Sequence, residues 1–224
     1  IYLDSDIVVL GDISELYNVD IGNNLVAAAP DDVIQTTKVF QEYAEKVVGV
    51  ADYRNYFNAG ILLMNLDEIR KFNFQDKFLY LLETIKFTVA QDQDYLNRLC
   101  KGKVKIIDKG WDRMPIANDD LPIEDIKIIH YNLADKPWRY DTIKYQEYFW
   151  EYAKKTEYYD YICRLKDEYT EEERFRDLQQ YKDLKALAQK ESDCVGDDRS
   201  NKKKNQQIEK SKERLEIFLE NSIE

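Results

Sequence analysis

The chain has 224 residues, of which 44% are hydrophobic and 13% aromatic, enough for one domain with a core and an additional segment. Charged residues make up 34% of the chain and give a formal net charge of −11, which repels nucleic-acid phosphates and argues against DNA or RNA binding. No apolar run approaches the ~20 residues that a membrane-spanning helix needs.

The first ten residues predict a strand that acidic residues interrupt. An apolar run, Ile1-Tyr2-Leu3, leads into Asp4-Ser5-Asp6, and a second apolar run ends at Leu10, before the expected turn Gly11-Asp12. Domain termini normally lie at the surface. Because the chain starts without Met and inside a buried strand, we expect it to be a fragment of a longer protein.

Strands and helices are then expected to alternate along the chain. Apolar runs predict further strands at Asn24–Ala29, Ile61–Met64, Val104–Ile107 and Ile126–His130. Helical spacing predicts one helix over Asp67–Thr84, with the candidate core positions Ile69, Phe78, Leu79, Leu81 and Leu82. A shorter helix is expected at Gln91–Lys101, and Gly102 ends it. This alternation predicts an α/β fold in which helices flank a sheet.

The pattern changes after about Tyr145. Residues Tyr145–Leu187 are rich in Tyr, Glu, Lys and Leu and predict two helices, whereas Ser192–Gln207 is polar and predicts a linker. Ile208–Ile223 has the spacing of a short amphipathic helix. We therefore expect three parts: an α/β domain at 1–152, a helical extension at 153–191, and a linker with a short helix at 192–224.

The first candidate site is Asp4-Ser5-Asp6, which directly follows an apolar run. In an extended chain residues i and i+2 point to the same side, so both carboxylates can face one ion. A divalent metal bound to a diphosphate would compensate two acids at the end of a buried strand. A solvated turn with two acids is the alternative.

The second candidate is His130, the single histidine, at the end of a predicted strand. A structural histidine is the alternative, but the following segment ends in Lys136-Pro137-Trp138, where a rigid Pro-Trp pair holds a cation. A lysine near a metal supplies a second counter-charge for a diphosphate. Two carboxylates with one imidazole suit manganese better than magnesium.

The third candidate is Asp92-Gln93-Asp94 at the start of a predicted helix. Acids in the first turn of a helix are favoured by the helix dipole, and this explanation covers at least one of them. The functional interpretation is that these polar groups contact a sugar ring and its acceptor.

With these motifs, the chain from Ile1 to about Tyr152 resembles the family 8 glycosyltransferases of the bacterial lipopolysaccharide-galactosyltransferase type, and more distantly glycogenin. YLDSDIVV is similar to the D-x-D strand of that family, and Tyr56-Phe57-Asn58-Ala59-Gly60 to its F-N-[AS]-G segment. Asp92-Gln93-Asp94 is similar to its D-Q-D run, and His130 to Trp138 to its H-[YF]-x(n)-K-P-W segment.

The resemblance implies a GT-A fold with a mixed, mostly parallel sheet and a C-terminal helical extension. It implies a UDP-sugar donor, manganese or magnesium, and transfer with retention of configuration. It places the metal on Asp4, Asp6 and His130 and the diphosphate on Lys136. It places the donor sugar and reacting centre at Asn58, Asp92 and Gln93, the last two as catalytic residues. Ser5 and Ala59 complete the donor-binding set.

The chain departs from the family pattern in two ways. Leu133 stands where such sequences often carry Gly, which affects a backbone contact to phosphate. The uridine- and ribose-binding segment of the family precedes the D-x-D strand, and it is absent from this sequence.

Two other functions remain open at this point. Asp4-Ser5-Asp6-Ile7-Val8 also fits the D-x-D-x-[TV] opening of haloacid-dehalogenase-like phosphatases, in which Asp4 would be a nucleophile and Asp6 a general acid/base with magnesium. That hypothesis leaves the other motifs unexplained. Alternatively, a non-catalytic glycan-binding or docking domain could use its charged C-terminal helices and Lys202-Lys203-Lys204 at a partner or membrane surface.

The expected partners are a UDP-sugar donor, with glucose or galactose not distinguished, and a glycan or glycolipid acceptor. Gln93 is a poor nucleophile, so attack by the acceptor on the same face as the leaving UDP is favoured over a double displacement. The odd, widely spaced cysteines Cys100, Cys163 and Cys194 predict a reduced, cytoplasmic chain. Weak contact with the inner face of a membrane stays open.

Overall fold

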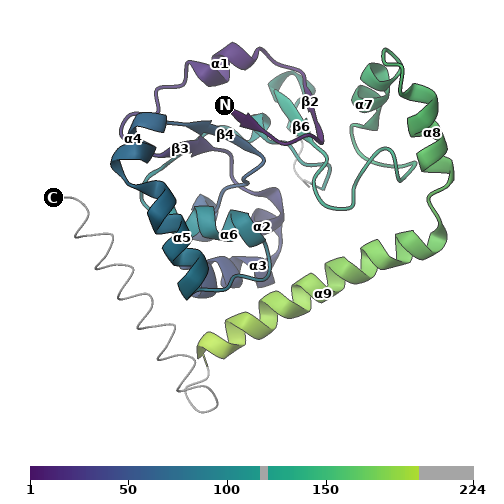
Figure 1. Cartoon of the computed structure of the whole chain (residues 1–224). Coiled ribbons are helices and arrows are strands. Elements are labelled where there is room, and N and C mark those ends of the chain that lie inside the picture. The colour runs from purple at the N-terminus through teal and green to yellow at the C-terminus, as the bar shows by residue number, and fades with distance from the viewer. Residues whose placement is uncertain (117–120, 197–224) are drawn as a thin grey trace.

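The computed structural model describes residues 1–116 and 121–196 and shows two small β-sheets surrounded by helices (Figure 1). The larger sheet has the strand order β1-β4-β3-β5, and the smaller pairs β2 with β6. The strands are β1 (Tyr2–Leu3), β2 (Ile7–Val9), β3 (Val26–Ala28), β4 (Ile61–Met64), β5 (Val104–Ile106) and β6 (Ile128–His130). The mixed α/β class expected from the sequence is confirmed.

The strand directions differ from the expected parallel majority. Among the described strands only β3 and β5 pair in parallel, with Val26 opposite Val104. β4 runs antiparallel to both β1 and β3, and β2 runs antiparallel to β6. Alternation of strands and helices does not determine direction, because a long connection can return to either end of a sheet.

The predicted strand over Ile1–Leu10 is in fact two strands that belong to different sheets. The backbone N–H of Asp4 still donates to the carbonyl of Gly60 in the larger sheet, over 2.8 Å. Two residues later the carbonyl of Asp6 accepts from the N–H of Tyr131, which follows β6, over 2.9 Å. The chain therefore changes hydrogen-bonding partner within Asp4-Ser5-Asp6.

The helices lie around the two sheets (Figure 1). They are α1 (Ile13–Tyr17), α2 (Asp32–Thr36), α3 (Lys38–Tyr43), α4 (Leu66–Lys71), α5 (Phe74–Thr84), α6 (Gln91–Leu99), α7 (Gln146–Ala153), α8 (Tyr159–Asp167) and α9 (Glu171–Gly196). Short helical turns occupy η1 (Ala44–Val48), η2 (Tyr53–Asn55), η3 (Lys109–Trp111) and η4 (Ile123–Asp125). Acid and amide side chains begin several of these helices: Asp12, Asp31 and Asn65 each accept a backbone N–H at the N-terminus of α1, α2 and α4.

The single helix predicted over Asp67–Thr84 is broken into α4 and α5. Asn73 has a left-handed φ of 52° between them, a conformation that asparagine tolerates better than most residues. Because of this break, the apolar face of α5 points in a different direction from that of α4. Leu81 is fully buried as expected, but Leu79 and Leu82 are 50% and 44% exposed, so their assignment to the core was wrong.

The central strands β3 and β4 of the larger sheet are buried on both faces, and alternate residues pack on opposite faces. Ala27 of β3 and Ile61 of β4 pack with Leu16 and Ile128, on the side of the smaller sheet. Val26, Ala28 and Leu62 pack on the other side, against Phe57 and Cys100. This two-residue period is the pattern of a strand covered on both faces, as predicted for Ile61–Met64.

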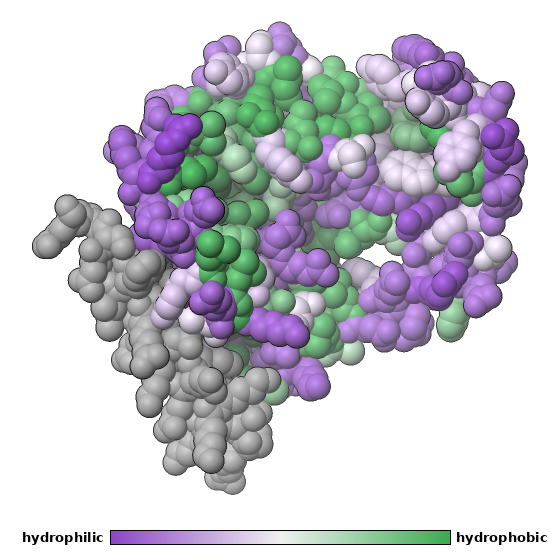
Figure 2. Space-filling view, viewed as in Figure 1, coloured by the Kyte–Doolittle hydropathy of each residue, from purple (hydrophilic) through white to green (hydrophobic). Residues whose placement is uncertain are grey.

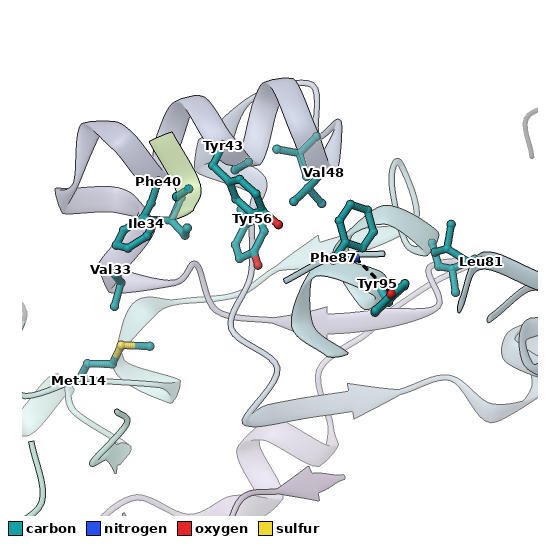
Figure 3. Close-up of a cluster of buried hydrophobic side chains, with 14 residues drawn as sticks. Val33, Ile34, Phe40, Tyr43, Val48, Tyr56, Leu81, Phe87, Tyr95 and Met114 are labelled. Atoms are coloured by element: carbon teal, nitrogen blue, oxygen red, sulfur yellow. Dashed lines mark hydrogen bonds between the residues drawn. The ribbon is translucent and has the colours of Figure 1, made fainter. Parts of the chain in front are cut away.

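A third cluster lies among the helices and includes part of α9 (Figure 3). Tyr181 of α9 meets Phe40 of α3 edge to face, with ring centroids 6.4 Å apart, and Ala188 one to two turns later is fully buried. The C-terminal residues form three helices where two were predicted. α9 continues through Ser192, where the linker was expected to begin, and residues 197–224, with the predicted Ile208–Ile223 helix, lie outside the described residues.

The surface of the molecule is uneven in polarity (Figure 2). In this view apolar side chains gather around the N-terminal strands, where Ile1, Tyr2 and Leu3 of the sheet edge are 44%, 47% and 37% exposed. The helices α7 to α9 show mainly hydrophilic residues. Within 1–116 and 121–196, no helix has the length and apolar content to cross a membrane.

Candidate active site

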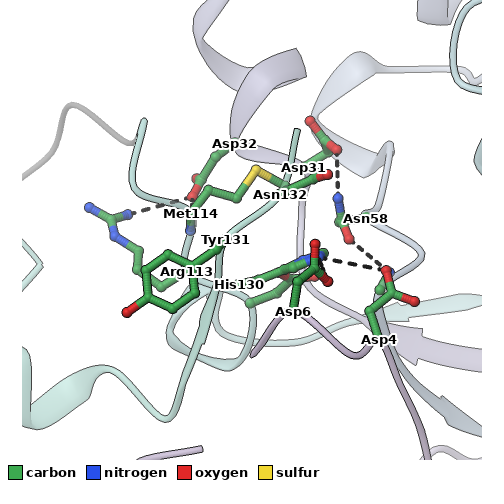
Figure 4. A network of polar contacts seen from close by, with 12 residues as sticks. Asp4, Asp6, Asp31, Asp32, Asn58, Arg113, Met114, His130, Tyr131 and Asn132 are labelled. Atoms are coloured by element: carbon green, nitrogen blue, oxygen red, sulfur yellow. Dashed lines mark hydrogen bonds and ion pairs between the residues drawn. The ribbon is translucent and has the colours of Figure 1, made fainter. Parts of the chain in front are cut away.

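Asp4, Asp6 and His130 meet where three strands end (Figure 4). Asp4 follows β1, Asp6 precedes β2, and His130 is the last residue of β6. Because Ile7 lies opposite His130 in the antiparallel pair, Asp6 is brought beside the imidazole. The Nε2 atom of His130 is 3.6 Å from an Asp4 carboxylate oxygen and 3.3 Å from one of Asp6. The three predicted ligands therefore lie together, with ligand atoms within 4.8 Å of one another.

A buried carboxylate that the sequence did not single out holds the imidazole from behind. Asp112 is fully buried, and its Oδ1 lies 2.9 Å from Nδ1 of His130, which is itself 2% exposed. This bond directs Nε2 toward Asp4 and Asp6, and that buried nitrogen has no hydrogen-bond partner among the described residues. Metal-binding histidines commonly have a carboxylate on the second nitrogen. The donor set therefore fits a divalent cation, with manganese suited to its two carboxylates and one imidazole.

The charges around His130 shift its protonation. Burial alone would lower the pKa of the imidazole, but its hydrogen bond to Asp112 and the nearby carboxylates of Asp112 and Asp6 raise it to about 10. Burial raises the pKa of Asp112 to about 6, against the effect of His130. Burial also acts to raise the pKa of Asp6, but its contacts with His130 and Lys136 hold that pKa well below its usual range. These contacts therefore favour the protonated form of the imidazole.

Gly60 leaves the space that the metal-binding residues fill. A Cβ atom at this position would lie 2.3 Å from Cε1 of His130 and 2.9 Å from a carboxylate oxygen of Asp4. Both distances are shorter than real carbon contacts allow. The glycine of the F-N-[AS]-G segment is therefore required by the close approach of strand β4 to the imidazole.

Lys136 lies at the outer side of the same site. Its ammonium group forms an ion pair with Asp6 and donates to the carbonyl of Tyr131, and its side chain is only 13% exposed. The ring of Trp138 lies 5.6 Å from the ammonium group. The predicted cation is thus held within reach of whatever binds between Asp4 and Asp6.

A second polar network begins next to Gly60 and is organised by Asp31. One Asp31 oxygen accepts from Asn58 over 2.9 Å and from Gln93 over 3.0 Å. The side-chain oxygen of Asn58 accepts from the N–H of Gly60, and that of Gln93 from the N–H of Ala59. Asp31 was missed in the sequence. Its position after a buried strand and Pro30 matches that of Asp4, and this signal could have found it.

The three residues of the D-Q-D run have different surroundings. Asp92 is exposed and faces the cleft, and Gln93 belongs to the Asp31 network. Asp94 is fully buried and accepts hydrogen bonds from the hydroxyls of Tyr43 and Tyr56, so it supports the fold. Among the other predicted residues, Ser5 is exposed and does not line the cleft, and its role in donor binding stays a prediction.

Asp4, His130 and the Asp31 network line one cleft of about 340 Å³, whereas Asp6 and Lys136 are not part of its lining. One part of its wall is polar and carries Asp4, Asn58, Asp92, Gln93, His130 and Asn132. The other part is apolar and carries Val33, Ile34, Phe40, Val89 and Leu184. Leu133 lies at the rim with a left-handed φ of 55° and is 41% exposed. The backbone there adopts the conformation that favours the glycine expected from the resemblance.

Comparison with known proteins agrees with this geometry. The family model described as glycosyl transferase family 8 matches residues 1–142. Glycosyltransferase GlyE of Streptococcus pneumoniae is 30% identical over 168 residues, which cover 68% of this chain and 37% of that protein. Lipopolysaccharide 1,2-glucosyltransferase of Escherichia coli is 29% identical over 164 residues, 65% of this chain and 46% of that protein. The chain therefore spans about half or less of the length of these relatives.

Two solved structures share the fold. The galactosyltransferase LgtC, in complex with donor and acceptor sugar analogs, has a TM-score of 0.57 and 30% identity, covering 70% of this chain and 60% of that one. The apo structure of the bifunctional glycosyltransferase WbbM has a TM-score of 0.65 and 26% identity. The match covers 73% of this chain and 34% of the WbbM chain. The haloacid-dehalogenase-like alternative is therefore wrong, since its D-x-D motif belongs here to a GT-A fold. With its family match, its fold and the meeting of its four motifs, this chain belongs to glycosyl transferase family 8.

Proposed function

We propose that this chain carries the metal-binding and sugar-binding part of a retaining hexosyltransferase. The enzyme moves glucose or galactose from a UDP-sugar to a glycan or lipopolysaccharide-type acceptor. The observation that carries the proposal is the meeting of Asp4, Asp6 and His130, with Asp112 behind the imidazole. The relatives named as glucosyl- and galactosyltransferases support the hexose donor.

The residues that would hold the metal are Asp4, Asp6 and His130, through two carboxylates and the Nε2 atom. A bound manganese or magnesium ion would offset the negative charge of the diphosphate as it leaves. Lys136 adds a second positive charge beside Asp6. The carboxylates of Asp4 and Asp6 are partly buried. The positive charges would therefore act on the diphosphate in surroundings where charge interactions are stronger than in water.

The donor sugar would lie beside Asn58, Ala59 and Gln93. Both ends of the Gln93 carboxamide are hydrogen-bonded, to the N–H of Ala59 and to Asp31, so its orientation is set before substrate binds. Such an amide can orient sugar hydroxyls but does not act as a carboxylate nucleophile. Asp92, exposed in the same cleft, is placed to accept hydrogen bonds from sugar hydroxyls.

The arrangement favours attack on the same face as the leaving group. The acceptor hydroxyl forms the new bond to the anomeric carbon, while the bond from that carbon to the UDP oxygen breaks. The acceptor proton passes to an oxygen of the departing diphosphate, so no protein base is required. The anomeric carbon acquires oxocarbenium character on the way, as in glycoside hydrolysis.

Release of UDP from a panel of UDP-sugars, with and without manganese, tests this function in the full-length gene product. Manganese-dependent release from one donor is expected for the wild type and lost in His130→Ala. Asp12→Asn, which changes an exposed acid at the start of α1, serves as the control and should release UDP normally. A folded protein that releases no UDP from any donor with metal present would contradict the proposal and favour a non-catalytic domain.

A further inference from the structure

The cleft has a second end that the donor-binding motifs do not occupy. Five apolar residues line it, and one of them, Leu184, comes from α9. The family match ends at residue 142, well before this helix begins. The contribution of α9 to the cleft therefore lies outside the motifs that this chain shares with the family.

A continuous series of contacts places this end relative to the metal-binding residues. Gly60 packs against His130, and its N–H donates to Asn58, which donates to Asp31. Asp31 in turn accepts the N–H of Ile34, where the apolar wall begins, over 3.0 Å. The contacts that link the apolar residues to His130 thus run through Asp31 and Asn58, beside the residues assigned to the donor sugar.

Helix α9 is held firmly against the core on both sides of Leu184. Tyr181 meets Phe40 edge to face, and Ala188 is fully buried in the same cluster. These three positions recur at intervals of three and four residues, so one face of the helix contacts the core. The half-buried Leu184 side chain is consequently fixed in the wall of the cleft.

The charge of the cleft restricts what can bind there. Its lining includes the carboxylates Asp4, Asp31 and Asp92, and no lysine or arginine among the described residues. A divalent cation held by Asp4, Asp6 and His130 would supply positive charge beside Lys136, at the diphosphate end. A sugar with a phosphate or carboxylate at the other end would meet apolar side chains and like charge without a counter-ion.

We propose that the apolar end receives an uncharged glycosyl acceptor through its C–H surface, and that Leu184 of α9 is a specificity-determining residue for that acceptor. This inference rests on the proposed function, since it requires that UDP-sugar turnover take place in the same cleft. Acceptors that present a neutral pyranose or an N-acetyl methyl group match the wall formed by Val33, Ile34 and Leu184.

The test separates donor use from acceptor use in the full-length enzyme. UDP release without acceptor reports the donor site, and transfer to matched neutral and carboxylated acceptors reports the apolar end. Leu184→Ala is expected to raise the KM for the neutral acceptor roughly tenfold, with donor hydrolysis and donor KM unchanged. Leu184→Met, which keeps the side-chain volume, should retain most of the acceptor binding. That result would show that the loss of acceptor binding in Leu184→Ala is not caused by unfolding.

Leu178→Ala is the matched control, because this leucine of the same helix is 63% exposed and does not line the cleft. Unchanged acceptor KM in Leu184→Ala, an equal rise in donor KM, or a preference for the carboxylated acceptor would each overturn the inference. If the wild type releases UDP but one of these results is obtained, this inference is wrong and the proposed function still holds. No UDP release from the wild type contradicts the proposed function, and this inference with it.

Discussion

Replacement of Gly60 by alanine should damage the metal site although the change adds one methyl group. The new Cβ would lie 2.3 Å from Cε1 and 2.9 Å from Nδ1 of His130. The imidazole cannot turn away easily, because it is 2% exposed and Asp112 holds its Nδ1 at 2.9 Å. Either the strand or the ring must move, and movement of the ring breaks the bond to Asp112.

The size of the effect follows from these contacts. Overpacking of a closely packed site costs about 1–3 kcal/mol, and loss of a buried hydrogen bond between charged groups costs about 1.5–3 kcal/mol. Together these contributions amount to about 2.5–6 kcal/mol, which corresponds to a fall in Tm of about 5–24 °C for a domain of this size. Disturbance of the group that orients a metal ligand typically weakens metal binding about 10–100-fold.

The assay is a calorimetric titration of the full-length protein with manganese, together with thermal unfolding with and without the metal. Gly11→Ala is the matched control for metal binding: its Cβ would lie 2.6, 3.1 and 3.3 Å from Cδ, Cβ and Cα of Lys127, away from the metal site, so it should leave the manganese affinity unchanged. Gly60→Ala with the manganese affinity and Tm of the wild type would refute the close-packing explanation for this glycine.

Three further predictions concern the surroundings of the site. The pKa of His130 is raised from 6.5 to about 10, so the charged imidazole stabilises the metal-free fold fully below about pH 6.5, and this contribution is lost as the pH rises toward 10. Thermal unfolding in the presence of a chelator should show this loss of stability in the wild type, and His130→Asn should not show it. Tyr56→Phe removes a 2.6 Å hydrogen bond to buried Asp94 and should cost about 1–3 kcal/mol in denaturant unfolding, whereas Tyr17→Phe, at a side chain 69% exposed, should cost nothing measurable. Leu133→Gly removes about 1–2 kcal/mol of strain from a left-handed residue, and this gain offsets the greater conformational freedom of glycine in the unfolded chain. The variant should therefore be as stable as the wild type or more stable. Leu165→Gly, at a similarly exposed leucine inside α8, should instead lose about 1 kcal/mol.

The meeting of the three candidate metal ligands could be predicted because each follows or precedes a strong apolar run. Asp4, Asp6 and His130 are adjacent to predicted strands, and strand ends are where ligand groups meet in α/β sheets. The helix at Gln91–Leu99 and the strand at Val104–Ile106 were likewise found, since clear spacing and a following glycine mark them.

Other features depended on contacts between distant residues and were not predictable. Asp112 follows a tryptophan in no recognisable pattern, and its importance comes only from its distance to His130. The break at Asn73 gave no periodic signal, and the strand over Ile1–Leu10 changes sheets within an otherwise continuous apolar pattern. The Tyr, Glu, Lys and Leu content of residues 145–187 indicates helices but does not say which surface each helix covers.

The division of the first ten residues between two sheets has a consequence for folding. Asp4 is positioned by the larger sheet, through the carbonyl of Gly60, while Asp6 and His130 belong to the smaller one. The three ligands can therefore converge only after both sheets have formed and docked. A cation bound there joins the two sheets, so it should raise the unfolding temperature of the whole domain in proportion to the logarithm of its concentration above Kd. Metal binding would then be a direct reporter of correct assembly, independent of any sugar.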